Sequence, residues 1–191
     1  LGVCEATKDA IKTSGVSKED LAGLAFGTMW KGIIPVNKDG KVLRNSIIWL
    51  DCRAEVQAQK INKKFGTELY SGGDYWPKLM WVKENEPWVI EEAETIFEVN
   101  SYLKWRACGE RVMDISNCFV SSFDKKMDQD YEELFQFIGI PRSKFPRWAS
   151  CDEKVGYVTA AAADEMGICE GAPVFAGCSD IAAIAIGSGQ I

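Results

Sequence analysis

Short apolar runs alternate with amphipathic segments along most of the chain. Apolar runs at residues 21–26, 46–50, 96–99 and 174–176 have the length and composition of buried strands. In 3–13, 53–65 and 128–138, apolar residues recur at helical spacing, so that one face is hydrophobic and the other polar. This alternation predicts an α/β chain, with a mixed sheet and flanking helices.

Two further apolar segments, residues 33–36 and 41–43, flank the polar sequence NKDG at 37–40. A short polar connection that ends in glycine is typical of a hairpin turn, in which Gly40 would adopt a positive φ. We therefore expect part of the strand pairing to be antiparallel.

One carboxylate near the end of the chain has an unusual setting. Asp180 comes soon after the apolar run 174–176 and Gly177, and six small or branched apolar residues, 181–186, follow it directly. A carboxylate between two apolar segments is costly to bury unless it has a partner or a task. This stretch alone favours an N-cap on a helix that begins at Ile181, and a chemical role stays open beside it.

Length and charge limit the classes of protein. The 191 residues are enough for one domain with a real core. The formal net charge of −6 argues weakly against nucleic acid or an anionic membrane as the main partner, because both need a basic footprint. No apolar run is long enough to span a bilayer.

Cysteine and histidine usage narrows the chemistry further. The seven cysteines form no CxxC pair and suit reduced thiols, so we expect a cytoplasmic protein. The sequence has no histidine, which excludes Ser-His-Asp and Cys-His catalysis and the usual zinc sites. An enzyme with this composition would depend on carboxylates, lysine, arginine or bound Mg²⁺, and we predict no metal-ligating residue in the chain.

Two segments have the composition of a small-molecule site. In GTMWKG at 27–32, Trp30 could stack on a sugar ring and Lys31 could bind hydroxyls or phosphate. Without context, a turn with Trp30 in the core is the better explanation. The GDYW segment at 73–76, with Tyr75 and Trp76, suits a binding loop and a packed aromatic turn equally well.

A third polar segment follows the apolar run 46–50. Asp51 and Arg53 place an acid and a base where the expected strand would end. An N-cap at Asp51 with a surface ion pair explains these residues as well as a role in binding does.

Five segments occur in an order and spacing that resemble a known family. They are VLRNSIIWLDCR at 42–53, PKLMW at 77–81, DISN at 114–117, GYVT at 156–159 and PVFAGCSD at 173–180. Together they resemble the FGGY carbohydrate kinases, especially the xylulokinase-like members, over nearly the whole chain.

The resemblance implies a fold and an activity. The fold would be the actin-like ATPase fold, built from two ribonuclease-H-like domains, with sugar and ATP between them. Such enzymes transfer the γ-phosphoryl group of ATP, with Mg²⁺, to a hydroxyl of a sugar or polyol. The family's catalytic base falls on Asp180, which would also contact the sugar. By position, Trp30, Lys31, Tyr75 and Trp76 would be further sugar contacts.

The chain departs from the family pattern in two ways. Xylulokinases typically carry Met-His-Gly where this chain has Met29, Trp30, Lys31 and Gly32, which puts D-xylulose specificity in doubt. Lys31 would then serve a different sugar or an acidic one. The family's N-terminal phosphate loop and C-terminal nucleotide domain are also absent. We therefore expect residues 1–191 to be a partial N-terminal, sugar-binding domain that is inactive alone.

Other interpretations stay open at this point. A non-enzymatic carbohydrate-binding or regulatory module could retain the fold without the ATP site. An unrelated α/β domain would be excluded by an actin-like arrangement of strands. The sequence names neither the sugar nor the oligomeric state, and a homodimer is among the possibilities.

Overall fold

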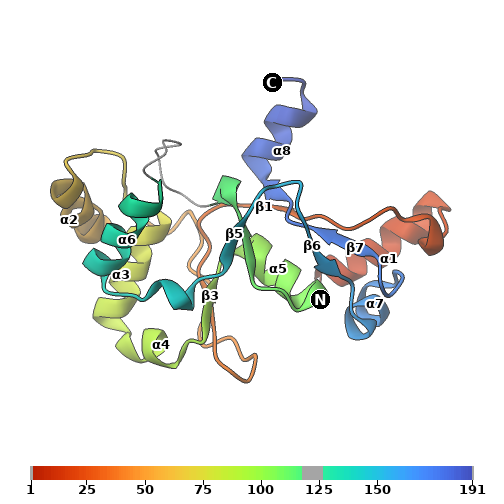
Figure 1. Ribbon diagram of the computed structural model, residues 1–191, viewed down its shortest axis with the longest axis horizontal. Helices are drawn as coiled ribbons and strands as arrows, with labels where there is room; N and C mark the ends of the chain where they lie inside the picture. The colour runs from red at the N-terminus through yellow and green to blue at the C-terminus, as the bar shows by residue number, and fades with distance from the viewer. Residues whose placement is uncertain (1, 118–126, 191) are drawn as a thin grey trace. The chain divides into compact units, whose positions relative to one another are not determined.

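The computed structural model describes residues 2–117 and 127–190, and the chain divides into two compact units (Figure 1). Unit 1 comprises residues 2–27, 100–115 and 147–190. Unit 2 comprises residues 28–99 and the described residues between 116 and 146. Each unit therefore combines segments that are far apart in the sequence.

Unit 1 packs helices against short strand pairs. Strands β4 and β5 pair in parallel, with Asp114 opposite Ala149, and β6 and β7 pair antiparallel, with Lys154 opposite Phe175. Strand β8 pairs with β1. The elements are α1 (Gly2–Ser14), η1 (Lys18–Asp20), β1 (Gly27–Thr28), α5 (Val99–Cys108), β4 (Val112–Asp114), β5 (Arg147–Ala149), β6 (Lys154–Tyr157), α7 (Ala160–Met166), β7 (Pro173–Phe175), β8 (Cys178–Ser179) and α8 (Asp180–Gly187).

The core of unit 1 consists mainly of small and branched side chains. Val112, Val155, Met166 and Val174 are among its buried members. The apolar run 21–26 was expected to be a strand, but it forms only an isolated parallel bridge, between Leu24 and Val174. The run still lies against this core, because Leu21, Leu24 and Phe26 are partly buried there.

Unit 2 is built around helix α3, which packs against α2, α4 and α6. Its two named strands, β2 and β3, pair antiparallel with Ile34 opposite Phe97. The elements are β2 (Ile34–Val36), α2 (Glu55–Phe65), α3 (Tyr75–Asn85), α4 (Pro87–Glu92), β3 (Thr95–Phe97), α6 (Met127–Ile138) and η3 (Arg142–Lys144); η2 (Ile115–Asn117) lies at the boundary of the units.

The hairpin predicted around residues 37–40 is confirmed. The Asn37 N–H donates to the Lys41 carbonyl at 3.0 Å, and Gly40 has a φ of 80°. The strand predicted at 46–50 is wrong, because only Ile47 pairs, in a bridge with Ile33. Residues 48–50 turn away and are exposed, which puts three apolar side chains in contact with solvent.

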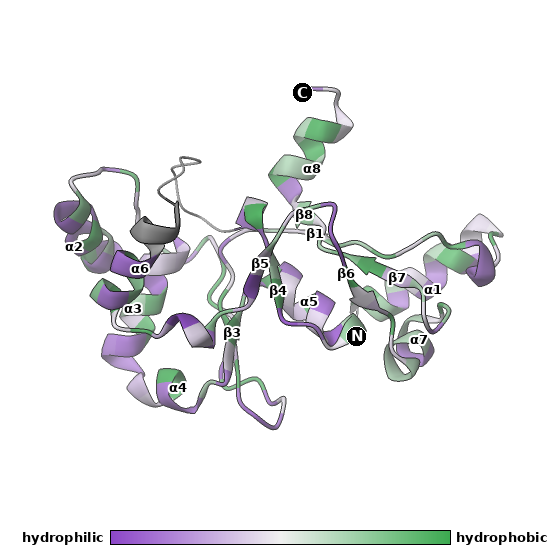
Figure 2. Ribbon diagram, in the orientation of Figure 1, coloured by the Kyte–Doolittle hydropathy of each residue, from purple (hydrophilic) through white to green (hydrophobic). Residues whose placement is uncertain are grey.

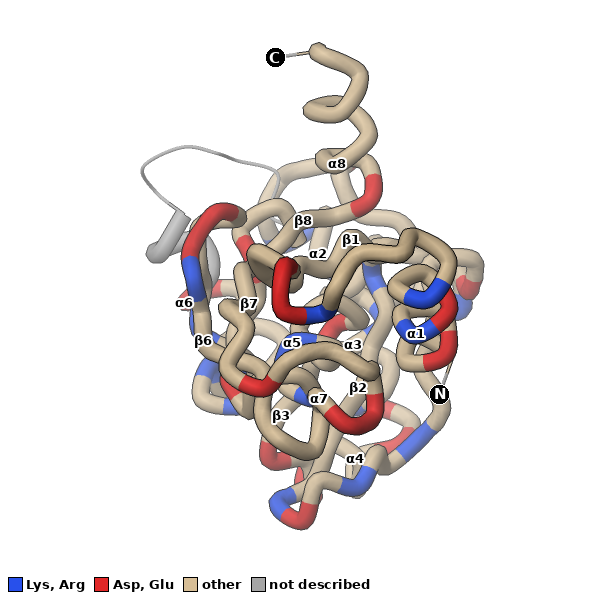
Figure 3. The backbone as a smooth tube through the Cα atoms, turned by 90° about the vertical axis from the view of Figure 1, so that its right-hand side faces the viewer, with Lys and Arg blue, Asp and Glu red and all other residues tan. Residues whose placement is uncertain are grey.

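Helix α8 combines a hydrophobic composition with exposure to solvent. Figure 2 shows α8 as a predominantly hydrophobic helix, and Ile181, Ile184 and Ile186 are more than half exposed on it. Acidic and basic residues are interspersed along the chain in Figure 3. Within residues 2–117 and 127–190, no helix has the length and apolar character needed to cross a membrane.

Candidate functional site

Asp180 is the first residue of α8, and its carboxylate is exposed. One carboxylate oxygen accepts the Ile181 N–H at 2.8 Å. The N-cap predicted at Asp180 is wrong, because Ser179 caps the helix and accepts the Ala182 N–H on its hydroxyl at 3.3 Å. A carboxylate in the first turn of a helix is favoured by the helix dipole, so the position suits an aspartate that is open to a ligand.

A tight turn at Gly177 precedes Asp180 and sets the position of the start of α8. Gly177 has a φ of 71°, and a Cβ atom there would lie 2.4 Å from the Phe26 carbonyl oxygen. The turn is bonded on both sides of this glycine: the Cys178 N–H donates to the Phe26 carbonyl at 3.3 Å, and the Gly177 N–H to the Cys151 carbonyl at 3.0 Å. Glycine is therefore required by both backbone conformation and space.

Two polar side chains of helix α5, one helical turn apart, donate hydrogen bonds to backbone carbonyls of the same turn. The Asn100 amide donates to the carbonyls of Phe26 and Cys178, at 2.7 and 3.1 Å. The Lys104 ammonium donates to the Ala176 carbonyl at 2.6 Å and lies 3.4 Å from the Asp114 carboxylate. All three side chains are fully buried. Asp114 belongs to the DISN segment at 114–117, but sequence reasoning gave none of the three a place in the site.

In unit 2, the loop after Gly27 contains a strained residue. Lys31 has a φ of 67°, and among the described residues it is the one non-glycine with a positive φ. Its ammonium lies 5.9 Å from the centre of the Trp30 ring, and Trp30 is partly buried. Strain of this kind at a non-glycine residue is often found at functional sites.

The Lys31 side chain is anchored to the start of α3. Its ammonium lies 2.5 Å from the Asp74 carboxylate, which also accepts the backbone N–H and the hydroxyl of Ser71, both at 2.7 Å. Burial alone would raise the pKa of Asp74, but the bonds from Lys31 and Ser71 outweigh it and hold this pKa below its usual value. Asp74 is therefore ionised and neutralises Lys31.

Tyr75 and Trp76 occupy interior positions on α3. Both side chains are fully buried. The Trp76 ring makes edge-on contacts with Phe135 and Phe145, at centroid distances of 5.5 and 5.6 Å. The Tyr75 ring lies 5.0 Å from Trp76. The packed aromatic turn that the sequence left open is thus present, and a sugar contact at these two residues remains a prediction.

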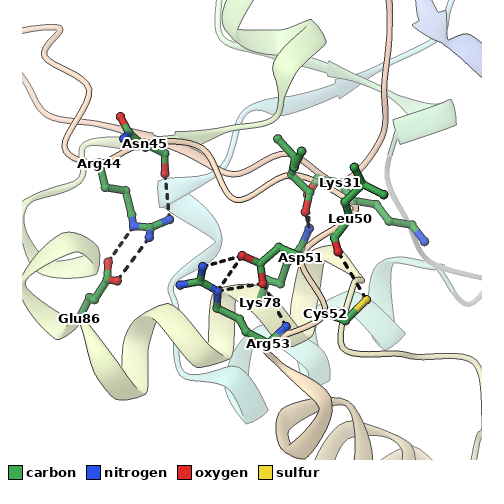
Figure 4. Close-up of polar contacts among 10 residues, drawn as sticks. Lys31, Arg44, Asn45, Leu50, Asp51, Cys52, Arg53, Lys78 and Glu86 are labelled. Atoms are coloured by element: carbon green, nitrogen blue, oxygen red, sulfur yellow. Dashed lines mark hydrogen bonds and ion pairs between the residues drawn. The ribbon is translucent and has the colours of Figure 1, made fainter.

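Asp51 and Arg53 form the surface ion pair that the sequence allowed. The Arg53 guanidinium donates to both carboxylate oxygens of Asp51 at 2.5 to 2.9 Å (Figure 4). It also lies over the Trp81 ring, 4.7 Å from the ring centre. The hydrogen bonds from Arg53 lower the pKa of Asp51. The N-cap considered for Asp51 is wrong, since α2 has its N-cap at Ala54.

Lys78 on α3 is another buried cation that the sequence did not single out. Its ammonium donates to the backbone carbonyls of Lys31 and Ile48, at 2.6 and 3.0 Å, and the side chain is fully buried (Figure 4). Burial lowers the pKa of Lys78 to about 8, although the carboxylates of Asp51 and Asp74 act in the opposite direction. Its sequence signals are its apolar neighbours, Pro77 and Leu79, and its place in the PKLMW segment at 77–81.

The predicted site residues thus fall into two sets. Trp30, Lys31, Tyr75 and Trp76 belong to unit 2, whereas Asp180 belongs to unit 1. In the described part of the chain, no group of three or more cysteine, aspartate or glutamate residues is placed to hold a metal ion. Magnesium that arrives with a nucleotide needs few protein carboxylates, because phosphate and water supply most of its ligands.

Comparison with known proteins decides the family. The family model described as the FGGY family of carbohydrate kinases, N-terminal domain, matches residues 2–187. The chain belongs to the FGGY family of carbohydrate kinases. The family that the order of motifs predicted is thereby confirmed.

The relatives of this FGGY chain include several sugar and polyol kinases. A xylulose kinase of Bacillus subtilis is 27% identical over 97% of this chain and 39% of its own length. A glycerol kinase of Thermococcus kodakarensis is 30% identical over 80% of this chain and 33% of its own length. The chain therefore spans about 39% of the length of the xylulose kinases that it matches.

Solved structures support the predicted actin-like ATPase fold of the FGGY kinases. The xylulose kinase from Rhodospirillum rubrum superposes with a TM-score of 0.83 at 25% identity, over 97% of this chain and 41% of that one. A xylulose kinase from Lactobacillus acidophilus superposes with a TM-score of 0.80 over 99% of this chain and 40% of that one, and its 22% identity shows the fold alone. An unrelated α/β domain is therefore excluded.

Proposed function

We propose that this chain is the partial N-terminal, sugar-binding domain of an ATP-dependent kinase that phosphorylates a hydroxyl of a sugar or polyol. The phosphate loop and the nucleotide domain would be supplied by sequence outside these 191 residues. Membership of the FGGY family and the names of the sugar and polyol kinases among its relatives support this proposal.

In this proposal, Asp180 is the general base. Phosphoryl transfer to an alcohol needs a positioned hydroxyl and a carboxylate that accepts its proton, with ATP and Mg²⁺ as the phosphoryl donor. The observation that carries this role is the exposed carboxylate of Asp180 at the start of α8, on a turn that buried side chains hold from below. The sugar contacts would come from Trp30, Lys31, Tyr75 and Trp76.

The ion pair of Lys31 with Asp74 supports a narrower proposal for the substrate class. Lys31 was the residue that an acidic sugar would have used, but its charge is already paired with Asp74 at 2.5 Å. A carboxylate on the substrate would have to compete with Asp74 for this ammonium. We therefore propose a neutral ketose or polyol as the substrate, in preference to an aldonate.

A screen of the full-length protein with Mg²⁺ and ATP over ketopentoses, polyols and aldonates tests the proposal. We expect turnover of a neutral substrate, and a loss of about 10²-fold or more in kcat for Asp180→Asn, the scale of general base catalysis. Asp164→Asn is the matched control, because Asp164 is another exposed carboxylate of unit 1, on α7.

Three outcomes would contradict parts of this proposal. Full activity of Asp180→Asn would remove Asp180 as the base, and selective turnover of aldonates would overturn the substrate class. Sugar binding without phosphorylation by the full-length protein would favour the non-enzymatic binding module. We also expect the 191-residue chain alone to phosphorylate none of these compounds.

A further inference from the structure

Lys78 is a buried lysine whose charge serves no ion pair. Among the described residues its ammonium lies within ion-pair distance of no carboxylate, and its hydrogen bonds go to the carbonyls of Lys31 and Ile48. Removing a cation from water without a paired anion is costly, and an apolar side chain at this position would avoid that cost. A buried lysine bonded in this way therefore suggests that the two carbonyls need to be held in place.

Lys31 and Ile48, which supply these two carbonyls, both lie outside the strands of the structure. Lys31 lies in the loop between β1 and β2 and has a left-handed backbone conformation, which is unfavourable for any residue with a Cβ atom. Ile48 begins the exposed turn 48–50. Figure 4 shows the Lys78 side chain reaching toward these segments from α3. One ammonium thus connects two loops through residues 47 and 30 positions away in the sequence.

A second contact holds the side chain of Lys31, in addition to the bond from Lys78 to its backbone carbonyl. Asp74 binds the Lys31 ammonium, and Asp74 lies directly before α3, four residues ahead of Lys78. The turn before Asp74 also packs closely on the turn 48–50, since a Cβ atom at Gly73 would lie 3.0 Å from the Trp49 carbonyl oxygen. The start of α3 therefore holds Lys31 at both its carbonyl and its ammonium.

We propose that Lys78 is a positioning residue for the sugar site, which holds the loop of Trp30 and Lys31 against the turn at Ile48. This proposal rests on the proposed function, in which Trp30 and Lys31 contact the sugar. In this proposal Lys78 acts through the loop and not on the sugar, because its ammonium is fully buried and donates to the carbonyls of Lys31 and Ile48. It acts by fixing the left-handed conformation at Lys31, and so the directions in which Trp30 and Lys31 present their side chains.

A purely structural role for Lys78 makes a different prediction, and the chain offers a matched control. Lys83, on the same helix, also donates to two backbone carbonyls, those of Ile138 and Gly139, at 3.1 and 2.8 Å. Those carbonyls lie at the end of α6 and just after it, and none of the predicted sugar contacts belongs to this segment. Loss of Lys83 removes the same kind of contact without touching the loop of Lys31.

The test compares Lys78→Met and Lys83→Met in the full-length protein, with the sugar that the screen identifies. We expect Lys78→Met to raise KM for the sugar at least tenfold. The fall in kcat should be smaller than this rise in KM, and KM for ATP should stay within twofold of the wild type. For Lys83→Met we expect both KM values within twofold of the wild type. Melting temperatures of the two variants separate lost stability from lost positioning. If Lys78→Met does not fold, Lys78→Gln, a neutral and shorter donor, is measured by the same criterion.

A sugar KM within twofold of the wild type in the folded variant overturns the inference. An equal rise in Lys83→Met overturns it too, because the effect would then be one of general stability. These results are distinct from failure of the proposed function, which would appear as a wild-type protein that phosphorylates no sugar or polyol.

Discussion

The Lys104 ammonium lies 3.4 Å from the Asp114 carboxylate, and both side chains are completely inaccessible to solvent. Lys104 also donates to the Ala176 carbonyl, in the segment that leads through Gly177 to Asp180. A buried ion pair seldom adds stability compared with apolar groups of similar size, but loss of one partner leaves an uncompensated charge. The pair therefore links α5 and β4 to the turn that presents the proposed base.

We expect Lys104→Met to lower the free energy of unfolding by about 3–5 kcal/mol, because the Asp114 carboxylate would remain buried without its cation. The double variant Lys104→Met, Asp114→Leu should recover at least half of this loss, because no buried charge remains. Urea denaturation of the wild type, both single variants and the double variant measures these differences.

The double variant also separates stability from catalysis. It still lacks the donor to the Ala176 carbonyl, so we expect kcat of the full-length protein to stay reduced after stability has recovered. If the double variant were as unstable as the two single losses added together, the two charges would not be coupled. If it recovered both stability and kcat, the pair would have no part in positioning Asp180.

Gly177 gives a second prediction, with a glycine of the same unit as its control. Gly177→Ala places a methyl group 2.4 Å from the Phe26 carbonyl oxygen at a φ of 71°, whereas Gly171, with a φ of 80°, has nothing within 4 Å of the same position. Gly171→Ala should lower the free energy of unfolding by about 1–2 kcal/mol, the cost of a left-handed backbone conformation for a residue with a Cβ atom. Gly177→Ala should lower it distinctly more, because the methyl group also meets the Phe26 carbonyl. Equal losses in thermal unfolding would show that the turn relaxes away from Phe26.

Much of the fold could be predicted because its signals are local. The hairpin at 37–40 needs only a polar turn and a glycine, and the helix ending at Gly66 needs only an amphipathic face and a left-handed residue, with a φ of 63°. The expected strand at 46–50 failed because strand formation depends on a distant partner. Only Ile47 finds one, in Ile33.

The residues of the candidate site differ in how far the sequence pointed to them. Asp180 stood out by its setting and by the role that the family motif gives it. Lys78 lies in the PKLMW segment but was given no role, and Lys104 looks like an ordinary surface lysine within a helical segment. Their burial follows from contacts 30 to 72 residues away in the sequence, which no local pattern reveals. The capping residue of α8 was missed by one position, since Ser179 and Asp180 are both good caps and the choice depends on where the turn at Gly177 ends.

Loss of the α8 cap should affect catalysis as well as stability. Ser179→Ala removes the acceptor of the Ala182 N–H and should cost about 1 kcal/mol. Thr159→Ala is a matched control, because Thr159 caps α7 with the same 3.3 Å bond, to the Ala162 N–H. Thermal unfolding should show similar losses for the two variants. We expect only Ser179→Ala to lower kcat, by about tenfold, since fraying of the first turn misplaces Asp180. Equal kcat values in the two variants would contradict this.

Lys78 predicts an unusual dependence of stability on pH. Its pKa is about 8 in the folded chain because burial disfavours the charged form, and its ordinary value is 10.5. Between these values the unfolded chain binds more protons at Lys78 than the folded chain does, so the free energy of unfolding should rise with pH. Below pH 8 the lysine is charged in both states, and the full cost of burying the charge remains. The neutral amine keeps two N–H donors for the carbonyls of Lys31 and Ile48, so the gain does not require these bonds to break.

The comparison of wild type with Lys78→Met isolates this contribution. Groups distant from Lys78 that titrate in alkaline solution are common to both proteins and cancel in the difference. From pH 8 to 10.5, we expect the stability of the wild type relative to Lys78→Met to increase by up to about 3 kcal/mol, the equivalent of the shift in pKa. Urea denaturation at half-unit steps of pH measures it. A difference that stays constant over this interval would mean that Lys78 titrates normally, and a difference that shrinks would mean that the folded chain stabilises its charge.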